Sequence, residues 1–182
     1  MSVLAYILRE TGHKAALGGN IGRPMIELLD DDYEFVVEEF SSYQASDLTV
    51  SPQIAMFTNL YYVHTDWHRG HENYCRDKIH LIANQKPGDV YFANRRNPQL
   101  VEYTRPYAEN RRWYNEAEVF HAEDGVLYRG KEKLADIREL KLSGKHNMDN
   151  LAGVFSVLEY LGIDVRRAAE ILKDFEPLPH LS

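Results

Sequence analysis

The sequence predicts a three-layer α/β protein in which a mainly parallel sheet is flanked by helices and followed by a small antiparallel hairpin. Segments of strand-like composition alternate with amphipathic helical segments along most of the 182 residues. Two of the strand-like segments, residues 33–40 and 53–60, are largely apolar, as expected of parallel strands buried on both faces. Near the end of this alternation, Asp124-Gly125 separates residues 118–122 from residues 125–130 and is a typical hairpin turn.

The remaining elements follow from periodicity and from residues that end helices. The opening segment is predicted to be a helix at residues 2–11, because Leu4, Ile7 and Leu8 share one face and Gly12 follows. Open α/β domains usually place a strand before their first helix, so we expect an N-terminally truncated domain. The other expected elements are strands at 14–17 and 89–93, helices at 24–29, 72–84, 148–161 and 165–175, and a polar segment with a loop at 41–52, with 95–114 left unassigned.

The composition excludes several classes of function. A net charge of −7 and a pI of about 5.6 argue against nucleic acid and membrane surfaces as partners, because polyanions would be repelled on average. The single cysteine, Cys75, excludes an internal disulfide framework and fits a reducing compartment. No apolar run is long enough to span a bilayer. We therefore expect a single cytoplasmic domain without membrane insertion.

Two charged residues are candidates for a site from their positions alone. Glu39 ends an apolar strand at the edge where ligands of open α/β sheets collect, so its carboxylate is well placed to hold a cation. The alternative is an exposed strand end satisfied by Ser41 and Ser42. Lys78 lies on the helix face expected to turn toward the sheet, where it either extends to solvent, or is paired or chemically modified.

A group of histidines follows the second apolar strand. His64 lies at the same expected edge as Glu39, and with His68, His71 and Cys75 it forms the pattern H-x₃-H-x₂-H-x₃-C. This spacing matches no common zinc signature. We therefore interpret His68 and His71 as partly exposed histidines around a loop rather than as metal ligands.

Two further segments have alternative interpretations. Arginines and aromatic residues are mixed within residues 95–114, as in some nucleic-acid-binding surfaces, but interspersed glutamates leave only a small local excess of positive charge. Residues 143–147 precede a predicted helix, and Asn147 is the natural N-cap of that helix. Capping does not account for Asn150 in the first helical turn.

A phosphate-binding loop is missing from the sequence. No G-x-x-x-x-G-K-[ST] run is present, because Gly144-Lys145 is followed by His146 and Gly130-Lys131 by Glu132. The chain therefore lacks the backbone N–H groups with which such a loop surrounds a triphosphate.

Taken in order, five motifs resemble the central domain of the Mur ligases, the ATP-dependent enzymes that build the stem peptide of peptidoglycan. The motifs are Gly18-Gly19-Asn20-Ile21-Gly22, Glu39-Phe40-Ser41-Ser42-Tyr43-Gln44, Asn59 followed by His64-Thr65-Asp66, Lys78 fourteen residues after His64, and Leu142-Ser143-Gly144-Lys145-His146-Asn147 continuing to Asn150. They most resemble the family member that adds D-glutamate to UDP-N-acetylmuramoyl-L-alanine. The resemblance covers nearly the whole chain.

The resemblance implies the role of each residue. Glu39 and His64 would hold Mg²⁺, and a carbamylated Lys78 would complete this catalytic metal site. The implied substrate-binding residues are Asn20, Ser41, Gln44 and His64, and the implied nucleotide-binding residues, which would face the adenine of ATP, are Asn147 and Asn150. The implied reaction forms an acyl phosphate on the substrate carboxylate, which the amine of the amino acid then attacks. The full-length enzyme would be monomeric.

The sequence also departs from the family pattern. The phosphate loop would end immediately before Ser2, and Leu181 follows His180 where family members usually have an arginine. Residues 1–176 would then be an incomplete ATP-binding central domain, and residues 177–182 the start of a linker to a C-terminal domain. We expect this fragment to be inactive as a ligase by itself. The alternative is a non-catalytic module of the same fold that binds a nucleotide or UDP-sugar or serves as a scaffold.

Overall fold

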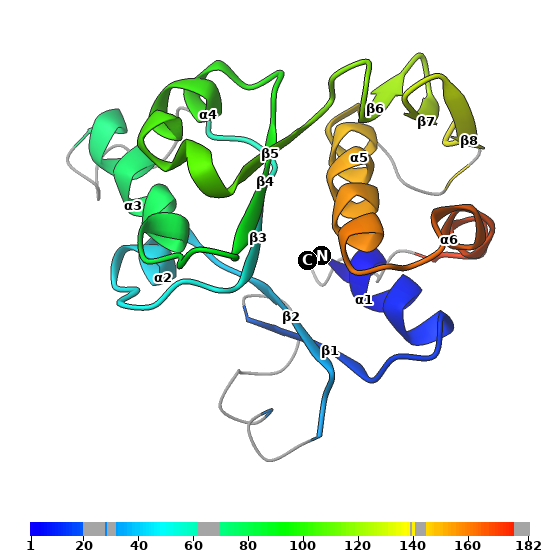
Figure 1. Cartoon of the computed structure of the whole chain (residues 1–182), viewed down its shortest axis with the longest axis horizontal. Coiled ribbons are helices and arrows are strands. Elements are labelled where there is room, and N and C mark those ends of the chain that lie inside the picture. Colours follow the sequence, from blue (N-terminus) through cyan, green and yellow to red (C-terminus); the bar gives the residue numbers. More distant parts are fainter. Residues whose placement is uncertain (20–27, 29–31, 62–69, 139, 141–144, 177–182) are drawn as a thin grey trace.

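The computed structural model describes residues 1–19, 28, 32–61, 70–138, 140 and 145–176, without the side chains of residues 145 and 146. The first half contains α1 (Ser2–Glu10), β1 (Ala15–Gly19), β2 (Phe35–Glu39), α2 (Ser42–Ser46), β3 (Ile54–Phe57) and α3 (His71–Ala83) (Figure 1). The second half contains β4 (Val90–Asn94), α4 (Pro98–Tyr103), the 3₁₀ helix η2 (Arg105–Asn110), β5 (Arg111–Tyr114), β6 (Phe120–Glu123), β7 (Val126–Arg129), β8 (Glu132–Asp136), α5 (Lys145–Tyr160) and α6 (Val165–Leu172). Within these ranges, no helix has the length and apolar content needed to cross a bilayer.

The predicted fold class is confirmed, with one difference in how the sheet is built. Parallel strands flanked by helices are present, together with a small antiparallel sheet. In the part of the chain that is described, however, the parallel strands form two separate sheets, β1-β2 and β3-β4-β5. The strands β2 and β3 are therefore each paired on one side only.

Burial of β4 on both faces explains its continuous apolar sequence. All five residues from Val90 to Asn94 are buried. Val90 and Phe92 belong to one core cluster, whereas Tyr91 and Ala93 belong to a second cluster with residues of α3. Alternate side chains of a strand point to opposite faces, so β4 separates two cores, as in a three-layer α/β fold.

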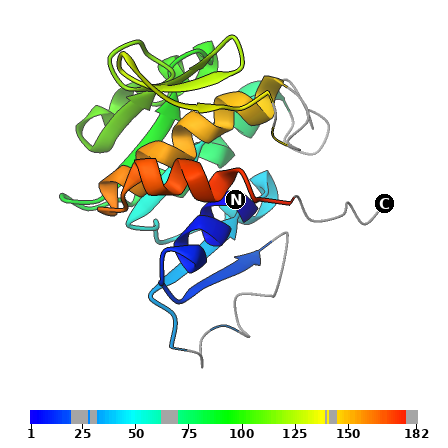
Figure 2. The same cartoon turned by 90° about the vertical axis from the view of Figure 1, so that its right-hand side faces the viewer.

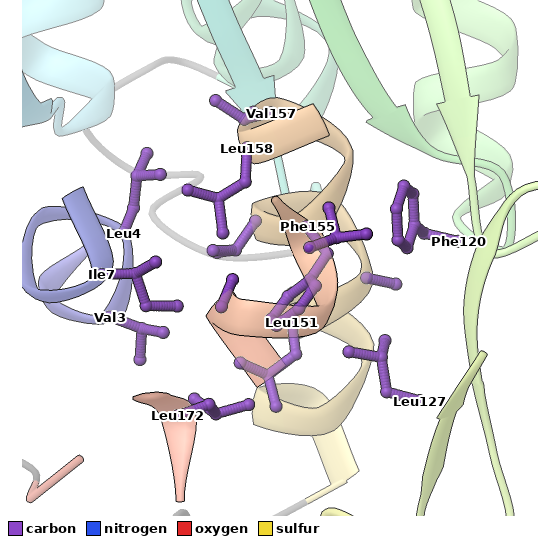
Figure 3. Packing of buried hydrophobic residues seen from close by; sticks show 14 of the residues in the cluster. Val3, Leu4, Ile7, Phe120, Leu127, Leu151, Phe155, Val157, Leu158 and Leu172 are labelled. Carbon is purple, nitrogen blue, oxygen red and sulfur yellow. The ribbon is translucent and has the colours of Figure 1, made fainter. Parts of the chain in front are cut away.

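The larger core surrounds α5, which lies between the β3-β4-β5 sheet and the antiparallel sheet (Figures 1 and 2). Figure 3 shows Leu151, Phe155 and Leu158 of α5 pointing into this cluster, which also receives side chains from α1 and from β6 and β7. Phe155 and Leu158 are fully buried. Complete burial of such a side chain contributes about 1.5–3 kcal/mol, so α5 is a main source of stability.

The structure adds an element to two expectations about local structure and corrects a third. The polar segment at 41–52 contains α2, a short helix that begins with a capping box at Ser41 and Gln44. The expected hairpin has a third strand, β8, whose charged edge sequence lacks the apolar run that identifies buried strands. Asn147 is not the N-cap of α5, because that helix already begins at Lys145.

The unassigned segment 95–114 contains α4, η2 and β5. The expected helix at 24–29 (apart from Leu28) and the expected linker at 177–182 lie outside the described residues. The other helices and strands predicted from periodicity are present, with bounds shifted by a few residues.

Candidate functional site

A cavity of about 660 Å³ lies between β2 and β3. Residues 35–40 form one wall and residues 54–59 the other, so the cavity runs along both strands and past their carboxyl ends. Residues of α1, α2, α3 and α5 and of the loop after α2 contribute the rest of the lining. The cavity therefore reaches the sheet edge at which the sequence predicts a site.

Glu39, Lys78 and Asn150 all line this cavity. Glu39 is the last residue of β2, Lys78 lies in the middle of α3, and Asn150 lies in α5. The three residues come from separate elements and are far apart in the sequence. The fold thus brings together one acidic, one basic and one amide side chain from the predicted site.

Lys78 lies in a partly buried position beside the end of β2. Its Nζ donates a hydrogen bond to the backbone carbonyl of Phe40 at 3.3 Å. Burial lowers the pKa of the Lys78 ammonium, and the negative charge of Glu39 opposes this by raising it. Burial is the larger effect, so the neutral amine is more accessible here than on a surface lysine.

The double glycine of the first motif has a steric role at the same strand end. Gly19 pairs with Glu39 across the β1–β2 ladder and has a φ of +90°. A Cβ atom on Gly19 would lie 2.6 Å from the Glu39 carbonyl oxygen. Only glycine allows this close approach, so Gly19 fixes the backbone that carries Glu39.

Ser41 and Gln44 form the capping box of α2. The backbone N–H of Gln44 donates to Ser41 Oγ at 3.2 Å, and the backbone N–H of Ser41 donates to Gln44 Oε1 at 2.8 Å. These bonds leave the Ser41 hydroxyl proton and the Gln44 amide NH₂ outside the box. The capping box therefore holds both predicted substrate-binding side chains in place. The hydroxyl proton of Ser41 and the amide protons of Gln44 are not used in it.

The two predicted nucleotide-binding residues differ in their surroundings. Asn150 lines the cavity, and its buried Oδ1 has no hydrogen-bond partner in the described part of the chain. Asn147 is exposed and is not part of the cavity lining. A buried acceptor without a partner is costly, so Asn150 is the more informative of the two.

A network of amide side chains at the strand ends was not predicted from the sequence. Asn94 Nδ2 donates to Asn59 Oδ1 at 3.4 Å, and Asn115 Nδ2 donates to Asn94 Oδ1 at 3.0 Å. Asn115 Nδ2 also lies 3.3 Å from the backbone carbonyl oxygen of Asp149, in the first turns of α5. The network connects the ends of β3, β4 and β5 with α5, next to Asn150.

An ion pair extends this network to the antiparallel sheet. Arg96 Nη1 donates to Asp149 Oδ1 at 2.7 Å and to the Ala122 carbonyl at 2.8 Å. A polar residue at the end of a strand, such as Asn94, or directly after one, such as Asn115, is the sequence signal for this arrangement. That signal is common to many loops, which is why the network could not be identified in advance.

Some predicted site residues cannot be placed. Asn20 and His64 lie outside the described residues, as does His68. His71 and Cys75 lie one turn apart on α3, with His71 Nε2 3.4 Å from Cys75 Sγ. No group of three or more potential metal-ligating His, Cys, Asp or Glu residues occurs among the residues the structure describes.

The arginines near β5 are engaged with aromatic rings of the protein itself. The guanidinium groups of Arg95 and Arg111 lie 4.9 Å and 4.3 Å from the centre of the Trp113 ring. Arg95 also forms an ion pair with Glu116 at 3.0 Å. Trp113 is thus occupied by intramolecular cation–π contacts, which accounts for the mixture of arginine and aromatic residues in this segment.

Comparison with known proteins gives relatives along nearly the whole chain. An "UDP-N-acetylmuramoyl-L-alanine--L-glutamate ligase" of Xanthomonas axonopodis pv. citri is 36% identical over 184 residues, which cover 98% of this chain and 39% of the relative. An "UDP-N-acetylmuramoylalanine--D-glutamate ligase" of Francisella philomiragia is 29% identical and is covered to 40%. The chain therefore spans about two fifths of the length of these relatives.

Solved structures of ligases have the same fold. The UDP-N-acetylmuramate:L-alanyl-gamma-D-glutamyl-meso-diaminopimelate ligase of Neisseria meningitides superposes with a TM-score of 0.75 at 16% identity, covering 98% of this chain and 63% of the other. The MurF ligase of Thermotoga maritima in complex with ADP gives a TM-score of 0.66 at 17% identity, covering 98% of this chain and 46% of the other. At these identities the comparison establishes the fold.

The family is established by sequence. The profile of the Mur ligase middle domain matches residues 20–158, which is more than two thirds of the chain. This match includes Glu39, Lys78 and Asn150, three of the residues that line the cavity at the ends of β2 and β3. The chain therefore belongs to the Mur ligase family.

Proposed function

We propose that this chain is the ATP-binding part of a ligase that joins glutamate to UDP-N-acetylmuramoyl-L-alanine in peptidoglycan precursor synthesis. The carboxylate of the substrate would be activated as an acyl phosphate and then attacked by the amine of glutamate. The observation that carries the proposal is that Glu39, Lys78 and Asn150 line one cavity at the carboxyl ends of β2 and β3. The names of relatives at 36% and 29% identity support the choice of substrates.

Glu39, Lys78 and His64 would hold Mg²⁺, and the chemistry of the first two fits this role. The Glu39 carboxylate is a preferred type of magnesium ligand, whereas an unmodified Lys78 would repel a cation. Carbamylation changes the Lys78 side chain from +1 to −1 and provides oxygen ligands. Lowering of the Lys78 pKa by burial favours the neutral amine that reacts with carbon dioxide. Bound Mg²⁺ would neutralise charge on the nucleotide phosphates and the transferred phosphoryl group.

Asn150 and Asn147 would contact the adenine of ATP. Asn150 supports this because its buried Oδ1 lacks a partner among the residues described, and an adenine amino group could donate to it. On the substrate side, Ser41, Gln44, Asn20 and His64 would line the UDP-muramoyl site. Ser41 and Gln44 retain donors outside their capping box for this purpose.

The domain arrangement follows from the same proposal. Residues 1–176 would form an incomplete central domain, and residues 177–182 would begin a linker to a C-terminal domain. Without a phosphate-binding loop, the 182-residue chain would not turn over ATP by itself. The complete enzyme would act as a cytoplasmic monomer.

The two relatives suggest different enantiomers of the amino acid. The sequence motifs favour D-glutamate, whereas the more similar of the two relatives is named for L-glutamate. In the Mur ligase family the C-terminal domain supplies much of the amino acid site, so we propose glutamate as the substrate and leave its enantiomer to direct assay.

The test is a ligation assay with a polypeptide in which residues 1–182 are joined to a phosphate-binding loop and to the terminal domains of the Xanthomonas relative. Product formation from UDP-N-acetylmuramoyl-L-alanine, ATP and either enantiomer of glutamate is expected. Loss of this activity in Glu39→Gln and Lys78→Ala variants, with retained folding, would support the assigned site. Full activity in both variants would contradict it, and nucleotide binding without any ligation would favour a binding module.

A further inference from the structure

The acceptor of Asn150 depends on helix α5 for its position at the cavity. Its buried Oδ1 has no hydrogen-bond partner among the residues that the structure describes. An oxygen without a partner does not fix the direction of its side chain, so the placement of this acceptor follows from the backbone that carries it. The groups that hold the first turns of α5 therefore decide where Asn150 Oδ1 lies.

Asp149, directly before Asn150, is held on two sides by residues outside the helix. Its Oδ1 accepts a hydrogen bond from Arg96 Nη1 at 2.7 Å, and its backbone carbonyl accepts one from Asn115 Nδ2 at 3.3 Å. The same Arg96 nitrogen donates to the carbonyl of Ala122 in β6 at 2.8 Å. Both the side chain and the backbone of Asp149 are therefore bonded to the sheets on either side of α5 (Figure 1).

The residues that hold Asp149 are themselves part of a connected polar network. Asn115 is 5% exposed, and its side chain also donates to Asn94 Oδ1 at 3.0 Å and accepts from the Ala122 N–H at 3.3 Å. Asn94 Oδ1 accepts from the backbone N–H of Arg96 at 3.2 Å. A buried network whose members have partners is rigid, so it gives Asp149 a defined position relative to the strand ends.

A close contact of Gly153 fixes how near α5 lies to the parallel sheet. A Cβ atom on Gly153 would lie 2.7 Å from Met56 Sδ and 2.9 Å from Tyr114 Cζ. Tyr114 is fully buried and donates its hydroxyl proton to the Phe57 carbonyl at 2.9 Å, so its ring has little freedom to move. Gly153 lies about one helical turn after Asn150, on the same side of the helix. This contact sets the depth of α5, which leaves its rotation to be set elsewhere.

We propose that Arg96 and Asp149 are positioning residues that set the rotation of α5 and thereby aim Asn150 at the amino group of an adenine base. The proposal rests on the proposed function, which assigns Asn150 to the adenine of ATP. Neither Arg96 nor Asp149 is among the residues that line the cavity, so both act through the helix and not by contact with the nucleotide. Their effect is on base selectivity, because only a base with an exocyclic amino group donates to the Asn150 oxygen.

A second ion pair on α5 provides a matched control. Arg129 of β7 pairs with Glu159, which lies nine residues after Asn150 and therefore about 13 Å further along the helix. The Glu159 side chain is 43% exposed, whereas that of Asp149 is 15% exposed. Both pairs join α5 to the antiparallel sheet, but only the Arg96–Asp149 pair lies next to Asn150.

The test compares two nucleotides by calorimetric titration of the complete, ligase-competent polypeptide. One is ADP, and the other is purine riboside 5′-diphosphate, which has hydrogen in place of the amino group. The variants are Arg96→Ala, Asp149→Ala, their double variant, Asp149→Asn and the control Arg129→Ala, with Asn150→Ala as the reference for a lost contact. Urea unfolding of each variant establishes that it is folded under the conditions of the titration.

The wild type should bind ADP about tenfold more tightly than the analogue, and Arg96→Ala and Asp149→Ala should each reduce this preference to about twofold or less. The double variant should lose no more than either single variant, because the two residues act as a unit. Asp149→Asn keeps an acceptor for Arg96 and should retain a preference of about threefold, because a neutral hydrogen bond is about half as strong as a charge-assisted one. Binding of the analogue should change little in any variant, and Arg129→Ala should keep the full preference.

The possible failures are distinguishable. Loss of the preference in Asn150→Ala alone, with full preference in the Arg96 and Asp149 variants, would overturn the positioning role and leave the adenine contact in place. An equal loss in Arg129→Ala, or equal weakening of both nucleotides, would reduce the Arg96–Asp149 pair to a stabilising contact and would also overturn it. A wild type without any preference for ADP would refute the adenine contact of the proposed function, and the positioning role with it.

Discussion

Lys78 on α3 donates a hydrogen bond from Nζ to the backbone carbonyl of Phe40, 3.3 Å away, and so connects this helix to the end of β2. The contact places the lysine in the cavity that Glu39 also lines. Burial and the neighbouring carboxylate act on the Lys78 pKa in opposite directions, with burial the larger effect. This residue therefore combines two properties that the proposed carbamylation requires, an amine that loses its proton more easily and a carboxylate, Glu39, that lines the same cavity.

The first prediction concerns Lys78 in the complete, ligase-competent polypeptide. Lys78→Ala should lower turnover by more than about a hundredfold, which exceeds the loss typical of residues that only support a metal ligand. Lys78→Arg is the matched control, because it keeps the positive charge but cannot form a carbamate. Its turnover should fall equally, and added short-chain carboxylates should partly restore the alanine variant.

A direct measurement of the modification accompanies these assays. In ¹³C-bicarbonate, the wild-type polypeptide should show a carbamate resonance by NMR that is missing from both variants. Near wild-type turnover in Lys78→Ala would show that Lys78 is an ordinary lysine extending to solvent.

The second prediction is that the 182-residue chain alone has no ligase turnover with ATP, Mg²⁺, UDP-N-acetylmuramoyl-L-alanine and glutamate. The sequence lacks the loop whose backbone N–H groups and lysine stabilise charge on the transferred phosphoryl group. The rate at which the chain releases phosphate from ATP should equal the rate measured for its Lys78→Ala variant. Ligation clearly above this control would mean that the chain completes its phosphate site in another way.

The third prediction separates a nucleotide contact from a structural role at Asn150. Asn150→Ala should weaken ADP binding to the complete polypeptide about tenfold, since a hydrogen bond of about 1–1.5 kcal/mol is lost. The free energy of unfolding should stay the same or rise slightly, because the variant removes a buried oxygen without a partner in the described residues. Calorimetric titration and urea unfolding measure the two effects.

The control for this experiment is Asn147→Ala. Asn147 is exposed and lies outside the cavity lining, so its substitution should change ADP binding less than that of Asn150. A loss of stability in Asn150→Ala that matches its loss of binding would identify Asn150 as a structural residue.

The fourth prediction concerns the pH dependence of stability at Cys75. Burial raises the pKa of this thiol from 9.0 to about 11, and Glu102 adds to the effect. Between these two values the unfolded chain releases the proton while the folded chain keeps it. Stability should therefore fall as pH rises from 9.0 toward about 11. The loss should be on the order of 1–2 kcal/mol relative to the trend of a Cys75→Ala variant.

Urea unfolding of both proteins at several pH values measures this difference in the free energy of unfolding. Both proteins contain the same tyrosines, so the effect of tyrosine titration cancels in the difference. Iodoacetamide should also label folded Cys75 far more slowly than the urea-unfolded chain near pH 8, since the thiol is buried and protonated. Rapid labelling of the folded chain would show that Cys75 is accessible.

The sequence was sufficient for the local elements but not for their pairing. Periodicity identified α1, α3 and α6, and the apolar strands β2 and β3, because these signals arise from residues close together in the chain. Separation of the parallel strands into two sheets depends on hydrogen bonds between distant segments, which periodicity does not report. The charged strand β8 was missed for the related reason that an edge strand needs no apolar run.

From the sequence, candidate site residues can be identified where they lie at the end of an apolar strand. The position of Glu39 at the end of an apolar strand makes it a candidate, and Glu39 lines one cavity with Lys78 and Asn150; its role as a ligand stays a prediction. The Asn94–Asn115 contact was not found, because asparagines after strands are usually turn residues. The N-cap predicted at Asn147 is wrong, because sequence alone does not distinguish a capping asparagine from one in the first turn of a helix.

The last prediction tests the steric role of the glycine beside Glu39. Gly19 and Gly12 both have a positive φ, +90° and +95°, so alanine at either position is strained by about 1 kcal/mol. A Cβ at Gly12 meets no atom within 4 Å, whereas one at Gly19 would lie 2.6 Å from the Glu39 carbonyl oxygen and 3.0 Å from its amide nitrogen. Because these contacts are with backbone, they cannot be relieved by a side-chain rotation.

Gly19→Ala should therefore destabilise the chain by about 2–4 kcal/mol, the sum of the φ strain and an overpacking term of about 1–3 kcal/mol. Gly12→Ala should cost only the first of these. Urea unfolding of the two variants and the wild type measures both values, and hydrogen exchange at β2 should increase in Gly19→Ala alone, since the clash pushes β2 away from β1. Equal destabilisation by the two substitutions would mean that β1 does not approach Glu39 this closely, and that the glycine pair serves only the local turn.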